Sequence, residues 1–207
     1  GPRIFIKRDD LTGLAFGGNK TRKLEFLIGD AISKGCDTII TGGAEQSNHC
    51  RQTAAACAVS GLECHLVLGG SEPETPKGNF LLDKLFGAGI HWTGKFRKGE
   101  KIPEIAKELK RLGKKPYIVP YGGSNEIGVA GFIEAVKELK TQLEEMIETV
   151  SHVVFSSSSG GTHAGLVLGK HIYHQNFELI GIEIDKEEFE GLSYSEHLIR
   201  LTNSAAK

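Results

Sequence analysis

Short runs rich in β-branched and aromatic residues alternate with helical runs along most of this 207-residue chain. Alternation of this kind is typical of parallel sheets, because each helix returns the chain to the end of the sheet where the next strand begins. The predicted strands are Ile4 to Lys7, Thr38 to Thr41, Cys64 to Leu68, Tyr117 to Val119, His152 to Phe155 and Leu179 to Ile184. The sequence therefore predicts an α/β fold of open parallel sheets with helices on both faces.

Two apolar stripes between the strands have helical spacing. They consist of Leu24, Leu27, Ile28, Ala31 and Ile32, and of Phe132, Val136, Leu139 and Leu143. Glycines at helix ends are predicted to be left-handed caps, and prolines to occupy first turns. These residues are Gly35, Gly61, Gly87 and Gly113, and Pro76 and Pro103.

Positive and negative charges nearly cancel, with 25 Lys and Arg against 26 Asp and Glu and no long run of either sign. This balance gives no electrostatic surface for nucleic acid or an anionic membrane, and it suits a small neutral or zwitterionic ligand. No apolar stretch reaches the roughly 18 residues of a membrane span. We therefore expect a cytoplasmic protein without nucleic-acid or membrane partners. Since the chain begins Gly1-Pro2 without a methionine, a targeting segment before this numbering is not excluded.

Cysteine and histidine spacing indicates no metal centre. Cys36, Cys50, Cys57 and Cys64 have no C-x-x-C spacing, so reduced and mostly buried thiols are expected. The histidines show neither zinc-protease nor zinc-finger spacing, and we expect no catalytic metal.

Polar loops follow several of the predicted strands. These loops are Asp9-Asp10, Ser47-Asn48, Gly122 to Asn125 and Ser156 to Thr162, and each follows a predicted strand. Right-handed crossovers place such loops along one edge of the sheet, where ligands of open α/β folds usually bind. We expect the chemistry of this chain to gather at that edge.

Lys20 ends a Gly17-Gly18-Asn19-Lys20 run and opens the amphipathic segment Thr21 to Lys34. Burial of a lysine lowers its pKa and frees the amine to condense with an aldehyde. Most lysines lie on the surface, and Lys23 and Lys34 are interpreted as solvated charges. The glycine turn makes Lys20 the candidate covalent anchor.

Ser47, Asn48 and His49 precede the alanine-rich stretch Ala54 to Ala58. Ser47 and Asn48 have the composition of a helix cap, whereas Asn48 can also donate its amide to a phenolic oxygen. His49 can bind a substrate carboxylate or be a buried structural histidine. The residues themselves leave both interpretations open.

The loop from Ser156 to Thr162 has small residues and a helix predicted to begin near Thr162. Free amides at a helix start bind anions, so the loop is a candidate phosphate site. An ordinary tight turn, or a cap by Thr162, is the alternative. No nucleotide-binding glycine motif occurs, so a nucleotide is disfavoured.

Four ordered runs resemble the pyridoxal-phosphate-dependent 1-aminocyclopropane-1-carboxylate deaminase and D-cysteine desulfhydrase family, of the tryptophan-synthase-β-like fold, or fold type II. The resemblance covers nearly the whole chain. The runs are Ile6 to Gly13, Gly17 to Lys20 with Arg22 to Glu25, Gln46 to His49, and Ser159 to Thr162 with Ala164 to Leu166.

The resemblance implies a role for each run. Lys20 would bind pyridoxal 5′-phosphate covalently and move the substrate proton. Asn48 would hold the phenolic oxygen of the cofactor and also lie at the substrate with Ser47 and His49, where Ser47 would be catalytic. The phosphate would be held by Ser158, Ser159, Gly160, Gly161 and Thr162. The family often has glycine where Ser158 stands, so here a side chain must be accommodated.

His49 bears on the substrate. Family deaminases usually carry glutamine at this position, and the sulfur-substrate lyases usually carry histidine. The resemblance therefore favours β-elimination on D-cysteine or a related sulfur amino acid, giving pyruvate, ammonia and sulfide. A 1-aminocyclopropane-1-carboxylate deaminase and a non-catalytic fragment that keeps the fold are the alternatives.

The family fold also implies two domains. Residues 23–131 would form a smaller inserted domain, and residues 1–22 and 132–207 a larger cofactor-binding domain. Family members continue past the length of this chain, into a segment with a catalytic tyrosine region and the group that faces the pyridine nitrogen. We therefore expect the larger domain to be incomplete at its C-terminal side, and we expect a homodimer.

Overall fold

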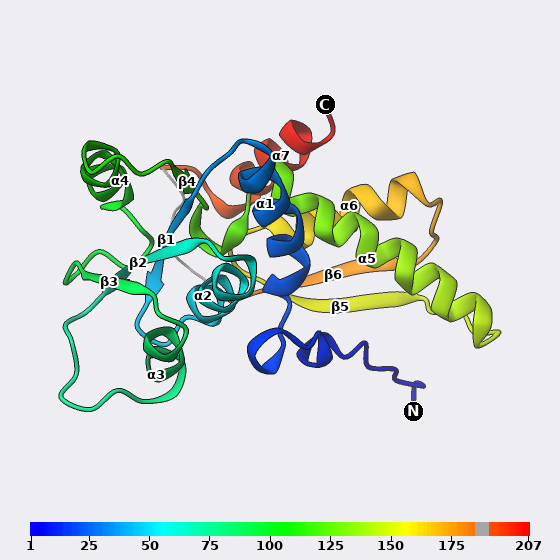
Figure 1. Ribbon diagram of the computed structural model, residues 1–207. Coiled ribbons are helices and arrows are strands. Elements are labelled where there is room, and N and C mark those ends of the chain that lie inside the picture. The colour runs from blue at the N-terminus through cyan, green and yellow to red at the C-terminus, as the bar shows by residue number, and fades with distance from the viewer. Residues whose placement is uncertain (185–190) are drawn as a thin grey trace.

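Two parallel sheets organise the fold of this computed structural model, which describes residues 1–184 and 191–207 (Figure 1). The larger sheet has the order β3-β2-β1-β4 and the smaller pairs β5 with β6, all in parallel. The strands are β1 (Thr38–Ala44), β2 (Glu63–Gly69), β3 (Gly89–Trp92), β4 (Pro116–Ile118), β5 (His152–Ser157) and β6 (Glu178–Glu183). The predicted α/β fold with parallel sheets is confirmed.

One strand of the structure was not predicted, and one predicted strand is wrong. β3 was missed because it has four residues, one of them glycine. The strand predicted over Ile4 to Lys7 is wrong: none of the described strands pairs with it, and Ile4 and Ile6 are 80% and 77% exposed. An extended apolar segment becomes a strand only where a neighbour completes its hydrogen bonds.

Helices cover both faces of the larger sheet. On one face α1 (Lys20–Ser33), α2 (Asn48–Ser60) and α3 (Gly78–Leu85) share a core with β1 and β2. On the other face α4 (Ile102–Arg111) packs on Ile40 and Val67. Cys50, Cys57 and Cys64 are buried and Cys36 is partly buried, so the prediction of mostly buried thiols is confirmed, and their reduced state stays a prediction.

The smaller sheet is covered on one face by α5 (Glu126–Glu145) and α6 (Gly161–Ile172), while Val154 and Ile182 on its other face are 63% and 52% exposed. α7 (Tyr194–Ala205) packs against α5 and α6. α1 contacts both α2 and α5, and so joins the two sheets. The larger sheet lies within 23–131 and the smaller within 132–207, but the domain boundaries stay a prediction.

The glycines and prolines at helix ends mostly have the predicted positions. The four glycines predicted as left-handed caps all have positive φ, and Pro103 lies in the first turn of α4. Pro76 was wrongly placed in a first turn, because α3 begins at Gly78. Three short 3-10 turns, η1 (Asp9–Leu11), η2 (Leu14–Phe16) and η3 (Tyr121–Gly123), complete the described elements. Among the described helices, none has the length and apolarity to cross a membrane.

Candidate active site

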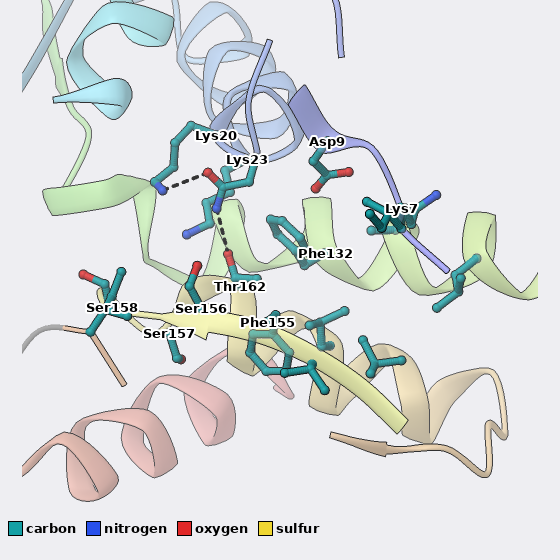
Figure 2. Close-up of a pocket in the computed structure, with 18 of the residues that line it drawn as sticks. Lys7, Asp9, Lys20, Lys23, Phe132, Phe155, Ser156, Ser157, Ser158 and Thr162 are labelled. Atoms are coloured by element: carbon teal, nitrogen blue, oxygen red, sulfur yellow. Dashed lines mark hydrogen bonds between the residues drawn. The ribbon is translucent and has the colours of Figure 1, made fainter. Parts of the chain in front are cut away.

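The loops after several strands meet around a cavity of about 620 Å³ (Figure 2). It lies between the first turn of α1, the start of α2 and the loop from β5 to α6, and it extends along α5 and β5 to the N-terminal segment. Six of the nine residues predicted for the site line it: Lys20, Asn48, Ser158, Ser159, Gly160 and Thr162. Ser47, His49 and Gly161 lie outside this lining.

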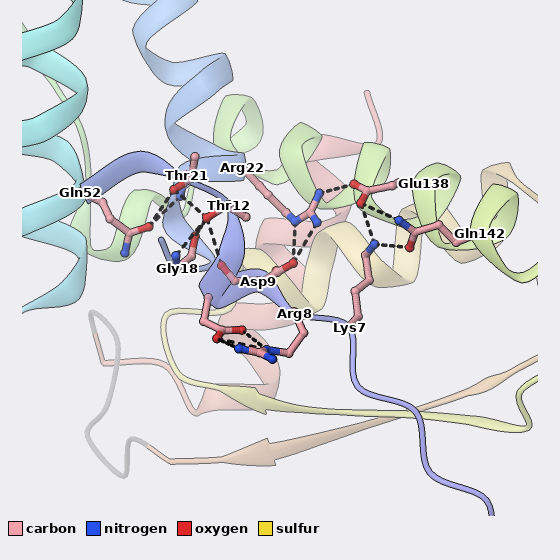
Figure 3. Close-up of polar contacts among 11 residues, drawn as sticks. Lys7, Arg8, Asp9, Thr12, Gly18, Thr21, Arg22, Gln52, Glu138 and Gln142 are labelled. Atoms are coloured by element: carbon pink, nitrogen blue, oxygen red, sulfur yellow. Dashed lines mark hydrogen bonds and ion pairs between the residues drawn. The ribbon is translucent and has the colours of Figure 1, made fainter. Parts of the chain in front are cut away.

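A tight glycine turn places Lys20 at the start of α1. Gly17 has a φ of 70°, and a Cβ there would lie 2.0 Å from the Asp10 carbonyl oxygen. The Gly18 amide donates to Thr12 Oγ1 at 3.0 Å (Figure 3). The glycine run is therefore required by the backbone path that leads to Lys20.

Gln52 fixes the Lys20 turn relative to Asn48. Its Oε1 accepts from the Thr21 amide at 3.0 Å, and its Nε2 donates to the Asn48 carbonyl at 2.9 Å. Gln52 is fully buried, so this single amide joins α1 and α2 at the cavity. Sequence reasoning missed it, although a glutamine beside an alanine-rich helical stretch was a visible signal.

The Lys20 amine is buried, and burial lowers its pKa to about 8. Its Nζ donates to Asn19 Oδ1 at 3.1 Å. A lysine with such a pKa has a substantial fraction of free amine near neutral pH, which is the form that attacks an aldehyde.

Lys23 was wrongly interpreted as a solvated charge. Its side chain is 1% exposed, and Nζ donates to the Gly122 carbonyl and to Ser124 Oγ, each at 3.1 Å. Burial, followed by the charge of Lys20, holds the pKa of Lys23 well below its usual range. Lys23 lies one helical turn after Lys20 and so shares its face.

The loop between β5 and α6 ends in an open helix start. Gly160 precedes the first turn with a φ of 83° and has no side chain to accept a hydrogen bond from the first amides. Such amides, with the helix dipole, form an anion site. Thr162 lies inside α6, so the alternative of a Thr162 cap is wrong. Its Oγ1 instead accepts from Asn19 Nδ2 at 3.4 Å (Figure 2).

Asn48 presents a donor to the cavity. Its Oδ1 accepts from Asn79 Nδ2 at 2.9 Å, which leaves its own Nδ2 group for a ligand. Asn79 lies in the first turn of α3, and its backbone amide also donates to Gln46 Oε1 at 2.9 Å. The predicted contact with a phenolic oxygen needs the Asn48 Nδ2 donor. Asn79 orients this side chain, and sequence reasoning did not find it.

Ser47 is the N-cap of α2, because its Oγ accepts from the Cys50 amide at 3.2 Å. The cap interpretation is therefore confirmed for Ser47. Its predicted catalytic and substrate-binding role stays a prediction.

His49 is 4% exposed and hydrogen-bonded to Thr41 at 2.8 Å through Nε2. Because the Thr41 hydroxyl donates to the Val119 carbonyl, it accepts from Nε2–H, and Nδ1 is left as a bare acceptor. Nδ1 is buried without a hydrogen-bond partner in the described structure. Burial, then Lys20 and Lys23, keep the pKa of His49 well below its usual range. Its substrate contact stays a prediction.

An ion-pair network fastens the N-terminal segment to this site (Figure 3). Arg22 of α1 binds Asp9 at 2.9 Å and Glu138 of α5 at 2.7 Å, and Lys7 binds Glu138 at 2.8 Å. Hydrogen bonding to Arg22 is the main cause that lowers the pKa of Glu138 to about 2. Asp9 reaches the cavity lining but is engaged by Arg22, so its role is structural.

These residues fit pyridoxal phosphate. Lys20 offers an amine with a lowered pKa, Asn48 an amide donor, and the start of α6 a first turn without a side-chain cap, in which the Gly161 amide donates to Ser124 Oγ. The loop also lacks side chains where space is tight: a Cβ on Gly161 would lie 2.6 Å from Ser124 Oγ and 2.8 Å from Lys23 Nζ. Glycine thus lets the anion loop approach Lys23 and Ser124.

Known proteins resemble this chain over most of its length. A protein of Pyrococcus abyssi named "Putative 1-aminocyclopropane-1-carboxylate deaminase" is 48% identical over 187 residues, which are 89% of this chain and 56% of that protein. A D-cysteine desulfhydrase of Klebsiella pneumoniae is 45% identical over 192 residues, 90% of this chain and 58% of that protein. The chain therefore spans somewhat more than half the length of these relatives.

The solved structures agree. The crystal structure of an ACC deaminase homologue has a TM-score of 0.86 and 44% identity, and the match covers 97% of this chain and 60% of that one. The model of the family described as pyridoxal-phosphate dependent enzyme matches residues 1–198. The chain belongs to the family of pyridoxal-phosphate dependent enzymes, with fold type II and pyridoxal 5′-phosphate as the cofactor.

Proposed function

We propose that this protein is a lyase that uses pyridoxal 5′-phosphate to release sulfide from D-cysteine or a related sulfur amino acid. The observation that carries the proposal is the meeting of the buried Lys20 amine, the Asn48 donor and the open start of α6 around one cavity. The resemblance adds the expectation of a cytoplasmic homodimer.

Each part of the site has a distinct task. Lys20 would hold the cofactor through its amine, Asn48 would donate to its phenolic oxygen, and Ser158 to Thr162 would bind its phosphate. When bound, the cofactor withdraws electrons from the substrate α-carbon. Gln52 fixes the Lys20 turn relative to Asn48, so the amine and the amide donor would hold the cofactor in one fixed arrangement.

Lys20 is also suited to proton transfer. A general base works best when its pKa is near the working pH, and burial brings Lys20 to about 8. Once the substrate amine has replaced Lys20 on the cofactor, the freed Lys20 amine would take the α-proton, and the bond from the β-carbon to sulfur would break with the electron pair leaving on sulfide. The remaining three-carbon amino acid, aminoacrylate, takes up water to give pyruvate and ammonia.

His49 supports a sulfur substrate. Its bare Nδ1 accepts a hydrogen bond but donates none, and it lies near enough to Lys20 and Lys23 to be affected by their charges. A substrate thiol, which 1-aminocyclopropane-1-carboxylate lacks, would satisfy this acceptor on reaching it from the cavity, whose lining does not include His49. The name of the Klebsiella pneumoniae relative, D-cysteine desulfhydrase, also supports a sulfur substrate.

A 1-aminocyclopropane-1-carboxylate deaminase is the second candidate, supported by the name of the Pyrococcus abyssi relative. The two are separated by incubating the purified protein and pyridoxal phosphate with each amino acid, and assaying pyruvate, sulfide and ammonia. We expect sulfide and pyruvate from D-cysteine. Ammonia from the cyclopropane substrate, with no sulfide from D-cysteine, would favour the deaminase. His49→Gln should shift the ratio of the two activities towards the cyclopropane substrate.

A further inference from the structure

A buried hydrogen-bond relay connects α1 to the anion loop. Lys23 Nζ donates to Ser124 Oγ and to the Gly122 carbonyl, each at 3.1 Å. The Gly161 amide donates to the same Ser124 Oγ at 3.1 Å. The hydroxyls of Ser124 and Ser159 lie 2.8 Å apart.

The contacts fix the direction of this relay. Ser124 Oγ accepts from both Lys23 and Gly161, so its single hydrogen donates to Ser159 Oγ. The hydrogen of Ser159 is then directed away from Ser124, and Ser159 lines the cavity. The loop thus offers a ligand the Ser159 hydroxyl, while the Gly161 amide is already engaged. This geometry does not favour the predicted cofactor contact of Gly161.

Counting the hydrogens on Lys23 Nζ shows that its neutral form is satisfied and that only its charged form needs a further acceptor. A neutral amine has two hydrogens, and among the described residues Nζ has two acceptors, both uncharged. Protonation would add a third donor and a full charge. Lys23 lines the cavity, so an anion there can accept that third hydrogen.

The surroundings of Lys23 oppose a lone positive charge. A Cβ on Gly161 would lie 2.8 Å from Nζ, so the amine is at the start of α6, where the helix dipole is positive. Two titratable groups interact electrostatically with Lys23, namely Lys20 of the same helix and His49 of α2. Neither is acidic, and η3 and α6 contribute the neutral Gly122 and Gly161.

We propose that Lys23 and Ser124 couple phosphate binding to proton uptake, with Lys23 neutral in the free protein and charged when a phosphate monoester occupies the loop. Lys23 is then a positioning residue that supplies charge to the phosphate from the floor of the cavity. The identity of the phosphate ester rests on the proposed function, since the cofactor brings it.

The test measures binding of pyridoxine 5′-phosphate, which has no aldehyde and so cannot react with a lysine. The protein carries Lys20→Ala, so that the Lys20 amine does not contribute to the change in bound protons. Calorimetric titrations are run at pH 8 in two phosphate-free buffers of different ionisation enthalpy. At this pH the ester is already a dianion, because its second pKa is about 6. Lys23→Met and Ser124→Ala are added to this background. Lys34→Met is the matched control, because Lys34 ends the same helix with its side chain 57% exposed.

We expect the Lys20→Ala protein to take up protons when it binds pyridoxine 5′-phosphate, and we expect the same when Lys34→Met is added. Adding Lys23→Met should abolish the uptake and weaken binding about tenfold or more, and Ser124→Ala should also weaken binding. Unchanged affinity and uptake with Lys23→Met would overturn the inference, and Ser124→Ala gives an independent result if Lys23→Met does not fold. Failure of the unsubstituted protein to acquire a visible pyridoxal phosphate band would instead overturn the proposed function.

Discussion

Lys20 and Thr162 are joined through one side chain, that of Asn19. Asn19 Oδ1 accepts from Lys20 Nζ at 3.1 Å, and its Nδ2 donates to Thr162 Oγ1 at 3.4 Å. The candidate covalent anchor on α1 and the anion loop of α6 are therefore spaced by a single amide, which holds the two ends of the cofactor site together.

Asn19→Ala should weaken pyridoxal phosphate binding by about two- to tenfold, because it removes a bridge worth about 0.5–1.5 kcal/mol per hydrogen bond. Titration of the visible band with cofactor measures this change. Asn203→Ala, at an exposed position of α7, is the matched control. Equal affinity of Asn19→Ala and the unsubstituted protein would show that Asn19 does not set this spacing.

The rate at which the protein acquires the visible band should rise with pH around a midpoint near 8. Burial lowers the pKa of Lys20 to about 8 from its ordinary 10.5, and only the neutral amine reacts. Stopped-flow absorbance between pH 6 and 10, with N-acetyl-lysine as the exposed reference, measures it. A midpoint near 10.5 for both amines would mean that Lys20 is solvated.

Asp83 should make the protein less stable as pH rises. Both carboxylate oxygens are buried without a partner in the described residues, and burial raises the pKa to about 7 against the opposing effect of Arg51. Between the ordinary pKa of 3.8 and about 7, the folded state holds a proton that the unfolded state has lost. The contribution of Asp83 to the free energy of unfolding is therefore largest below pH 3.8. It falls by up to about 1.4 kcal/mol per pH unit as the pH rises to about 7.

Asp83→Asn should flatten this dependence and raise the unfolding temperature at pH 8. Urea unfolding from pH 4 to 8 measures the slope, with the exposed Glu25→Gln as control. The account of Asp83 is wrong if the variant keeps the slope of the unsubstituted protein.

Arg22→Met should free the N-terminal segment. Arg22 is 15% exposed at its side chain and binds Asp9 and Glu138, so we expect a loss of about 1 kcal/mol in unfolding free energy. Trypsin should also cleave faster after Lys7 and Arg8. Arg111→Met, at the exposed end of α4, serves as control, and equal cleavage rates in both variants would contradict the anchoring role.

Much of the fold follows from local pattern. The strands at Thr38, Cys64 and His152 and the glycine caps were predictable because apolar runs and left-handed turns are properties of short segments. The segment Ile4 to Lys7 has the composition of a strand, but a strand needs a partner that composition does not specify.

The site was predictable where the motif itself carries the chemistry. Lys20, Asn48 and the loop before α6 lie around one cavity, as their positions after strands or glycine turns suggested. Lys23 and Gln52 were not found, and Ser124 was included only within the polar loop Gly122 to Asn125, because their contacts join segments far apart in sequence. The residue type alone also does not distinguish a buried lysine from a surface lysine, because burial depends on tertiary packing.

The central claim is that Lys20 binds the cofactor covalently, and borohydride reduction followed by peptide mass spectrometry tests it most directly. The protein is mixed with pyridoxal phosphate, reduced and digested, and every lysine is examined for the pyridoxyl adduct. We predict the adduct on Lys20 and its loss in Lys20→Ala with the circular dichroism spectrum retained. An adduct mainly on Lys23 or on surface lysines, unchanged in Lys20→Ala, would contradict the claim.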